Sequence, residues 1–135
     1  MWTVEHGAES TIEPDAVWRA WADVERWPEW NGDIAEIRLQ GEFAGGSTIT
    51  MTPFGQEPVE LRITELVAGE RFVDEADLGG TIVRTDHRIE RIAGGRTRVV
   101  YTLSASGPAE EEVGAAVSDD FPETIARLLG YAASH

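Results

Sequence analysis

His87 and Tyr101 are the side chains whose types and spacing best fit proton-transfer chemistry in this sequence. In the run 81–92, His87 shares its phase with Val83 and Thr85, while charged residues hold the alternate positions. In the run 96–106, Tyr101 shares its phase with apolar residues in the same way. A period of two places alternate side chains on opposite faces of a strand, so both are expected to point inward. The turn containing Gly94 predicts that the two runs pair as antiparallel neighbours.

Such a pair could carry out acid–base chemistry on a bound small molecule. A buried imidazole stays neutral at neutral pH, so His87 could act as a general base. Tyr101 could then donate a hydrogen bond to a developing enolate oxygen. The alternative is that both side chains only line a cavity, or pack in the core with their polar ends satisfied by the backbone or by water.

Trp18, Trp21, Trp27 and Trp30 cluster within thirteen residues. Most of them are expected to be structural and to fill the junction between short helices and a sheet. Trp30 precedes Asn31 at the apex of a loop, and we expect it at the mouth of the cavity.

Other common chemistries lack their motifs here. The chain has no Cys, and none of its three His has the spacing of a metal site, so neither a metal nor a cofactor is expected. No nucleophile elbow and no glycine-rich dinucleotide fingerprint is present. The acidic run 74–77 is expected to form a solvated face of a strand.

The elements that must position these side chains alternate between strand and helix. A period of two predicts a strand over 2–12, and helical spacing follows Pro14 up to Pro28. The segment 27–32 is expected to be a turn or a very short helix that ends at Gly32. Six further strands are predicted at 34–43, 47–53, 58–67, 70–78, 81–92 and 96–106, separated by glycine-containing turns.

The last segment predicts a long amphipathic helix over 109–134. Apolar residues recur there at spacings of three and four, from Val113 to Ala132. Pro122 interrupts the hydrogen bonding, and a kink within one helix is expected between Ser118 and Pro122. The fold class is therefore α+β, and the helices are expected to cover one face of a seven-stranded antiparallel sheet.

Length and charge narrow the function classes. The chain has 135 residues, the size of one ordinary domain, and 1–135 is expected to be a single ligand-binding domain. Its net charge of −14, with Arg as the only basic residue type, argues against nucleic acid and anionic membrane surfaces as partners. No window is apolar enough to span a membrane, so stable membrane insertion is not expected. A cytoplasmic protein, monomer or homodimer, is predicted.

The segments 16–30, 66–72, 94–99 and 106–108 resemble the START/Bet v 1-like (SRPBCC) superfamily, in its polyketide cyclase/dehydrase-like branch. The similarity extends over essentially the whole chain. It implies a helix-grip fold, in which a curved sheet wraps around the last helix and leaves an elongated cavity. This superfamily includes aromatase/cyclases, lipid and quinone binders and hormone receptors, whose ligand residues share no single motif.

The expected ligand is therefore a hydrophobic or aromatic, polyketide-like small molecule held between the sheet and the C-terminal helix. The expected ligand-binding residues are Trp30, Ile37, Leu39, Met51, Leu61, Ile63, Val83, Thr85, Val99, Leu103, Val117, Phe121 and Ile125. A polyketide cyclase or dehydratase is the enzymatic possibility, with His87 and Tyr101 as the catalytic residues. A lipid or quinone carrier or sensor needs the same pocket without catalysis. A protein-partner module would instead require an exposed apolar or basic patch.

Overall fold

Seven antiparallel strands form one sheet, which a computed structural model describes together with the rest of residues 1–135. Their order across the sheet is β1-β7-β6-β5-β4-β3-β2, so each strand after β2 pairs with its predecessor and β1 closes against β7. The strands are β1 (Trp2–Ser10), β2 (Ile34–Gln40), β3 (Thr48–Pro53), β4 (Val59–Val67), β5 (Arg71–Leu78), β6 (Thr81–Ile92) and β7 (Arg96–Ser106). The predicted α+β helix-grip fold is confirmed.

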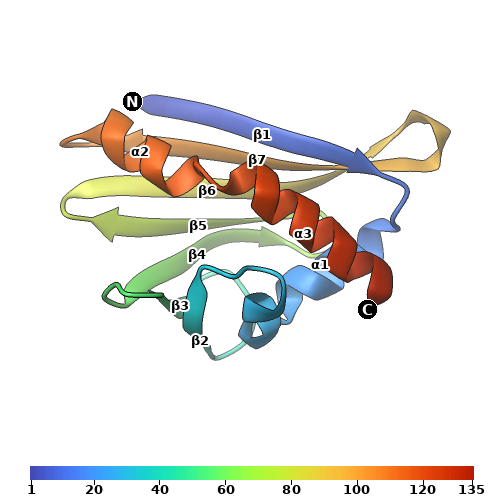
Figure 1. Cartoon of the computed structure of the whole chain (residues 1–135), viewed down its shortest axis with the longest axis horizontal. Helices are drawn as coiled ribbons and strands as arrows, with labels where there is room; N and C mark the ends of the chain where they lie inside the picture. The colour runs from blue at the N-terminus through green and yellow to red at the C-terminus, as the bar shows by residue number, and fades with distance from the viewer.

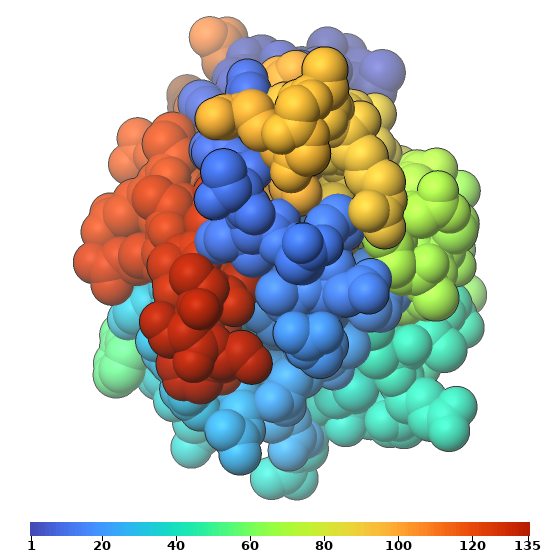
Figure 2. All heavy atoms as spheres, turned by 90° about the vertical axis from the view of Figure 1, so that its right-hand side faces the viewer, coloured from blue at the N-terminus to red at the C-terminus, as the bar shows by residue number.

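Helices cover one face of this sheet. The α1 helix (Pro14–Ala22) and the 3₁₀ helix η1 (Val24–Glu29) connect β1 to β2, and a short 3₁₀ turn, η2 (Ala93–Gly95), joins β6 to β7. The C-terminal helical segments α2 (Glu110–Ser118) and α3 (Phe121–Ser134) cross the sheet diagonally (Figure 1). Figure 2 shows one end of the molecule, where α1 packs between the end of α3 and the β6–β7 turn.

The long C-terminal helix is divided where the kink was expected. Asp119 and Asp120 lie between α2 and α3, and Pro122 occupies the first turn of α3 instead of a helix interior. Proline is tolerated in a first turn because its missing N–H would have no helical partner there. The expected kink within one helix is therefore a short break between two segments that follow one course.

Alternation along the strands separates a charged convex face from an apolar concave face. On β6, Arg84 and Arg88 form ion pairs across the convex face, with Glu65 and Glu5 respectively. The intervening Val83 is 3% exposed and belongs to the core. This arrangement confirms the predicted orientation of the strand, because a one-residue shift would have exchanged the two faces.

Two glycines show how closely the sequence fits this fold. Gly94 has φ of 79° in the β6–β7 turn, a conformation that other residues rarely adopt. Gly114 of α2 lies against Trp2 of β1, and a Cβ atom at this position would be 2.4 Å from the indole ring. The helix can therefore approach the first strand only without a side chain at position 114.

No helix in the structure is both long and apolar enough to cross a membrane.

Candidate functional site

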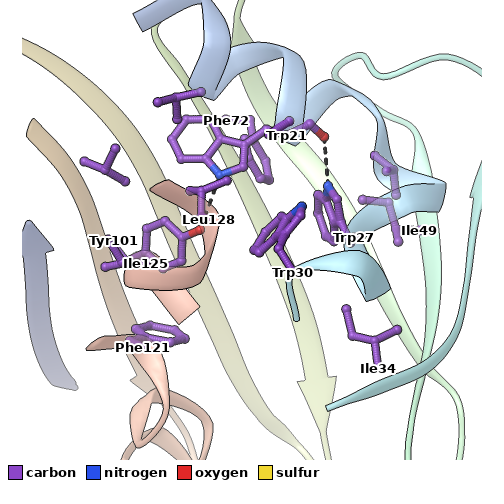
Figure 3. Close-up of a cluster of buried hydrophobic side chains, with 14 of the residues drawn as sticks. Trp21, Trp27, Trp30, Ile34, Ile49, Phe72, Tyr101, Phe121, Ile125 and Leu128 are labelled. Atoms are coloured by element: carbon purple, nitrogen blue, oxygen red, sulfur yellow. Dashed lines mark hydrogen bonds between the residues drawn. The ribbon is translucent and has the colours of Figure 1, made fainter. Parts of the chain in front are cut away.

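A cavity of about 820 Å³ lies between the concave face of the sheet and the helices. Its walls come from β3 to β7, the segment that follows η1, and the facing side of α2 with the start of α3. Figure 3 shows Tyr101 and Phe121 across from Trp30 and Trp27, which lie on the other side of this region. A volume of this size is within the usual range for small-molecule sites, about 300–1,000 Å³.

A row of aromatic rings crosses the floor of the cavity. Phe72 pairs with His87, which pairs with Tyr101, so three neighbouring strands place these rings side by side. The rings of Phe72 and His87 stack with their centroids 4.0 Å apart, and Tyr101 meets His87 edge-on at 4.6 Å. The sequence predicted that His87 and Tyr101 would share a wall, and the structure places both on the lining of this cavity.

Both polar ends in this row have partners. The Nδ1–H of His87 donates to the carbonyl oxygen of Phe72 at 3.2 Å, which leaves the lone pair on Nε2. The indole N–H of Trp21 donates to the Tyr101 hydroxyl at 3.3 Å, so the phenolic hydrogen remains available to a ligand. Burial lowers the pKa of His87 to about 3, and the hydrogen bond to Phe72 opposes this only partly. Burial also raises the pKa of Tyr101, so both side chains are neutral at neutral pH.

Asp74 lies in the cavity wall, contrary to the prediction of a solvated acidic face over 74–77. It is 6% exposed and lines the cavity, on the same face of β5 as Phe72 and Ala76. Of the other acidic residues in this run, Asp77 is exposed and Glu75 is half-buried. Burial, and secondarily the charge of Glu75, raise the pKa of Asp74 to about 7. The signal was present in the sequence, since the alternation 72, 74, 76 and 78 places this carboxyl inward.

More carboxyl groups line the cavity near the break between α2 and α3. Asp120 belongs to this break, and Asp33 comes from the segment between η1 and β2. Burial, and secondarily a hydrogen bond with Asp33, raise the pKa of Asp120 to about 6. Phe54, in the β3–β4 turn, also lines the cavity and is 67% exposed, so this side of the cavity meets solvent.

The expected ligand-binding residues fall into two groups. Those that line the cavity are Trp30, Met51, Leu61, Val83, Thr85, Val117 and Phe121. Those that pack in or against the core without lining it are Ile37, Leu39, Ile63, Val99, Leu103 and Ile125. Trp30 is buried at 6% exposure, and the centroid of its ring lies 6.0 Å from that of Trp27. The role of these residues in binding remains a prediction.

Aromatic side chains of α1 and η1 form one end of the cavity wall. Trp21 is fully buried, and its ring contacts Phe72, His87 and Tyr101 at centroid distances of 5.3–6.2 Å. Trp27 donates its N–H to the carbonyl oxygen of Trp21 at 3.0 Å. These contacts fix the tryptophans as structural parts of the wall, as expected for most of the cluster.

Comparison with known proteins adds a family to this geometry. Residues 1–132 match the family described as polyketide cyclase / dehydrase and lipid transport. The chain belongs to this family. A search of curated sequences found no relative of the chain.

Solved structures of the START/Bet v 1-like superfamily share the fold at low sequence identity. The Zhui aromatase/cyclase from a Streptomyces species has a TM-score of 0.80 and 17% identity, over 97% of this chain and 93% of that one. A START superfamily protein from Mycobacterium smegmatis has a TM-score of 0.74 and 15% identity, over 98% and 97%. The structure of Ara h 8.0201 has a TM-score of 0.73 and 20% identity, over 99% of both chains. At these identities the likeness concerns the fold alone.

Proposed function

We propose that this protein binds an apolar or aromatic small molecule in the cavity between the sheet and α2–α3. The observation that carries the proposal is the cavity itself, which has a volume of about 820 Å³ and a predominantly apolar and aromatic lining. Family membership supports it, because the family description includes lipid transport. Sites of this kind combine apolar walls with a few polar groups that orient the ligand, here Asp74, Thr85, His87 and Tyr101.

Catalysis as a polyketide cyclase or dehydratase is the second candidate. Its support is that His87 and Tyr101 face the same cavity and that Tyr101 retains a free hydroxyl hydrogen. However, a base is most effective when its pKa lies near the working pH, and that of His87 is about 3. The weak basicity of His87 therefore favours binding over catalysis. In an enzyme, His87→Gln and Tyr101→Phe would lower turnover by about a hundredfold or more, whereas a carrier would show only altered affinity.

A protein-partner module has less support. The large exposed apolar side chains are Met1, Phe54, Val67 and Ile82. They come from the N-terminus, a turn and two different strands, so they offer no obvious shared surface. Only Phe54 lines the cavity, where an apolar side chain suits a ligand entrance as well as a partner.

The test of binding uses N-phenyl-1-naphthylamine, an uncharged dye whose fluorescence rises in apolar surroundings. Val83→Trp and Leu61→Trp fill the cavity from two strands, and both should weaken dye binding at least about tenfold while the melting transition is retained. Ile82→Trp is the matched control, because Ile82 is the neighbour of Val83 on the same strand but is 40% exposed on the outer face. Unchanged affinity in both cavity variants would place the dye elsewhere and overturn the proposal.

A further inference from the structure

Asp74 is a carboxyl group inside an apolar cavity with no partner in the protein. Its side chain makes no hydrogen bond and no ion pair, and only 6% of the residue's surface is exposed. Neither carboxylate oxygen of Asp74 is completely buried, so both retain some accessible surface. Asp74 lines the cavity, and that surface is therefore open to a ligand.

The cavity supplies no positive charge that could neutralise this carboxyl. All basic residues of the chain apart from His are Arg, and none of them lines the cavity. The guanidinium groups of Arg71, on the same strand as Asp74, and of Arg84, on the neighbouring β6, bind carboxylates on the convex face. The imidazole of His87 is held neutral by burial, which lowers its pKa.

Every other charged side chain that faces the cavity is also acidic. Asp33, Asp119 and Asp120 line it together with Asp74, so a cation that enters meets only negative charge. Aromatic rings form much of the remaining wall, including those of Trp30, Phe72 and Tyr101. Aromatic faces attract cations through their electron density, whereas they give a carboxylate no such compensation.

We propose that the cavity selects ligands that join an apolar or aromatic body to a protonated amine, for which Asp74 is the counter-ion. This inference rests on the proposed function, because it names the class of small molecule that the same cavity binds. Burial of an unpaired charge is costly, and an ammonium group on the ligand removes that cost while it donates hydrogen bonds to the carboxylate. An anionic ligand would place two like charges in one apolar space and is selected against.

Binding of an amine also has a proton signature. Near pH 7, Asp74 is partly protonated, since its pKa is about 7. A bound ammonium group favours the carboxylate, so the complex forms with release of part of a proton. The other ionisable groups that line the cavity are His87, Tyr101, Asp33, Asp119 and Asp120. Glu75, on the opposite face of the same strand, also acts on Asp74 through its charge.

The experiment compares three probes that share a naphthalene ring and differ only in their polar end. They are 2-(2-naphthyl)ethanol, 2-(2-naphthyl)ethylamine and 3-(2-naphthyl)propanoate, titrated by calorimetry at pH 7 in two buffers of different ionisation enthalpy. The amine should bind at least about tenfold more tightly than the alcohol, with proton release, and the carboxylate more weakly than the alcohol. Asp74→Asn should abolish both the advantage of the amine and the proton release.

Asp77→Asn is the matched control, because it makes the same chemical change on the exposed face of the same strand. It should leave the amine preference unchanged. Equal binding of alcohol and amine to the parent protein would overturn the amine assignment while leaving the cavity intact. An amine preference that survives in Asp74→Asn would show that the amine is bound elsewhere and would also overturn it. If none of the three probes binds, the proposed function itself fails.

Discussion

Asp74→Asn should make the protein more stable at alkaline pH, although it removes a charged residue and adds no contact. In the native state, burial raises the pKa of Asp74 from 3.8 to about 7. In the unfolded chain the pKa of this carboxyl returns to its ordinary value of 3.8. Between these two values the native state holds a proton that the unfolded state has lost, so ionisation opposes folding as the pH rises.

The magnitude follows from the difference between the two pKa values. A difference of about three units, at about 1.36 kcal/mol per unit, corresponds to up to about 4 kcal/mol of lost stability. The loss is absent below pH 4, grows as the pH rises to 7 and is complete above it. Asparagine has nearly the same shape but cannot ionise. The variant should therefore gain little at pH 4 and most at pH 8.

Urea unfolding at one-unit steps from pH 4 to pH 8 measures this difference directly. The quantity of interest is the free energy of unfolding of the variant minus that of the parent, because the other titrating groups then cancel. Asp77→Asn, on the exposed face of β5, is the control for the substitution itself, because asparagine keeps an oxygen that can accept the hydrogen bond from the Gly80 N–H. A difference for Asp74→Asn that is flat across this range would refute the reasoning.

The remaining predictions concern the core and the surface. His87 should show no NMR titration between pH 8 and pH 5, because burial holds its pKa near 3, and a midpoint near 6.5 would contradict its inward position. Its depressed pKa also means that stability is lost as the pH falls from about 6.5 toward 3, and His87→Gln should lack this loss in acid unfolding. Gly114→Ala should destabilise by about 1–3 kcal/mol in urea unfolding, because its Cβ would overlap Trp2, whereas Gly130→Ala in the open part of α3 should not destabilise. Phe121→Asp should unfold the protein or lower its melting temperature severely, since it buries a charge in the core, and a normal melt would contradict that packing. Duplex DNA and RNA should show no saturable binding at physiological salt, which a gel-shift titration checks against the net charge of −14.

The sheet could be predicted because its signals are local. Alternating apolar residues defined each strand, and glycines with positive φ, such as Gly69 and Gly94, marked the turns. Short connections then required antiparallel neighbours. The orientation of His87 and Tyr101 followed from the same alternation, and the structure places both on the cavity wall.

The site was harder to predict because it depends on what fills the concave face. Leu103 and Ile125 are buried in the core as expected, yet neither lines the cavity. Asp74 was missed because Glu75 and Asp77 follow it closely, and a cluster of charges is usually solvated. The alternation along β5 nevertheless places the carboxyl inward, and the pairing of Asp74 with Thr85 of β6 agrees with it.

The most direct test of the central claim is to locate a bound probe by NMR. Intermolecular nuclear Overhauser effects between 2-(2-naphthyl)ethanol and selectively labelled methyl groups report which side chains lie within about 5 Å of the ring. Binding in the cavity predicts contacts to Met51, Leu61 and Val83, which line it from three strands. Contacts confined to the exposed Val67 and Ile82, with none to the cavity methyl groups, would contradict the account.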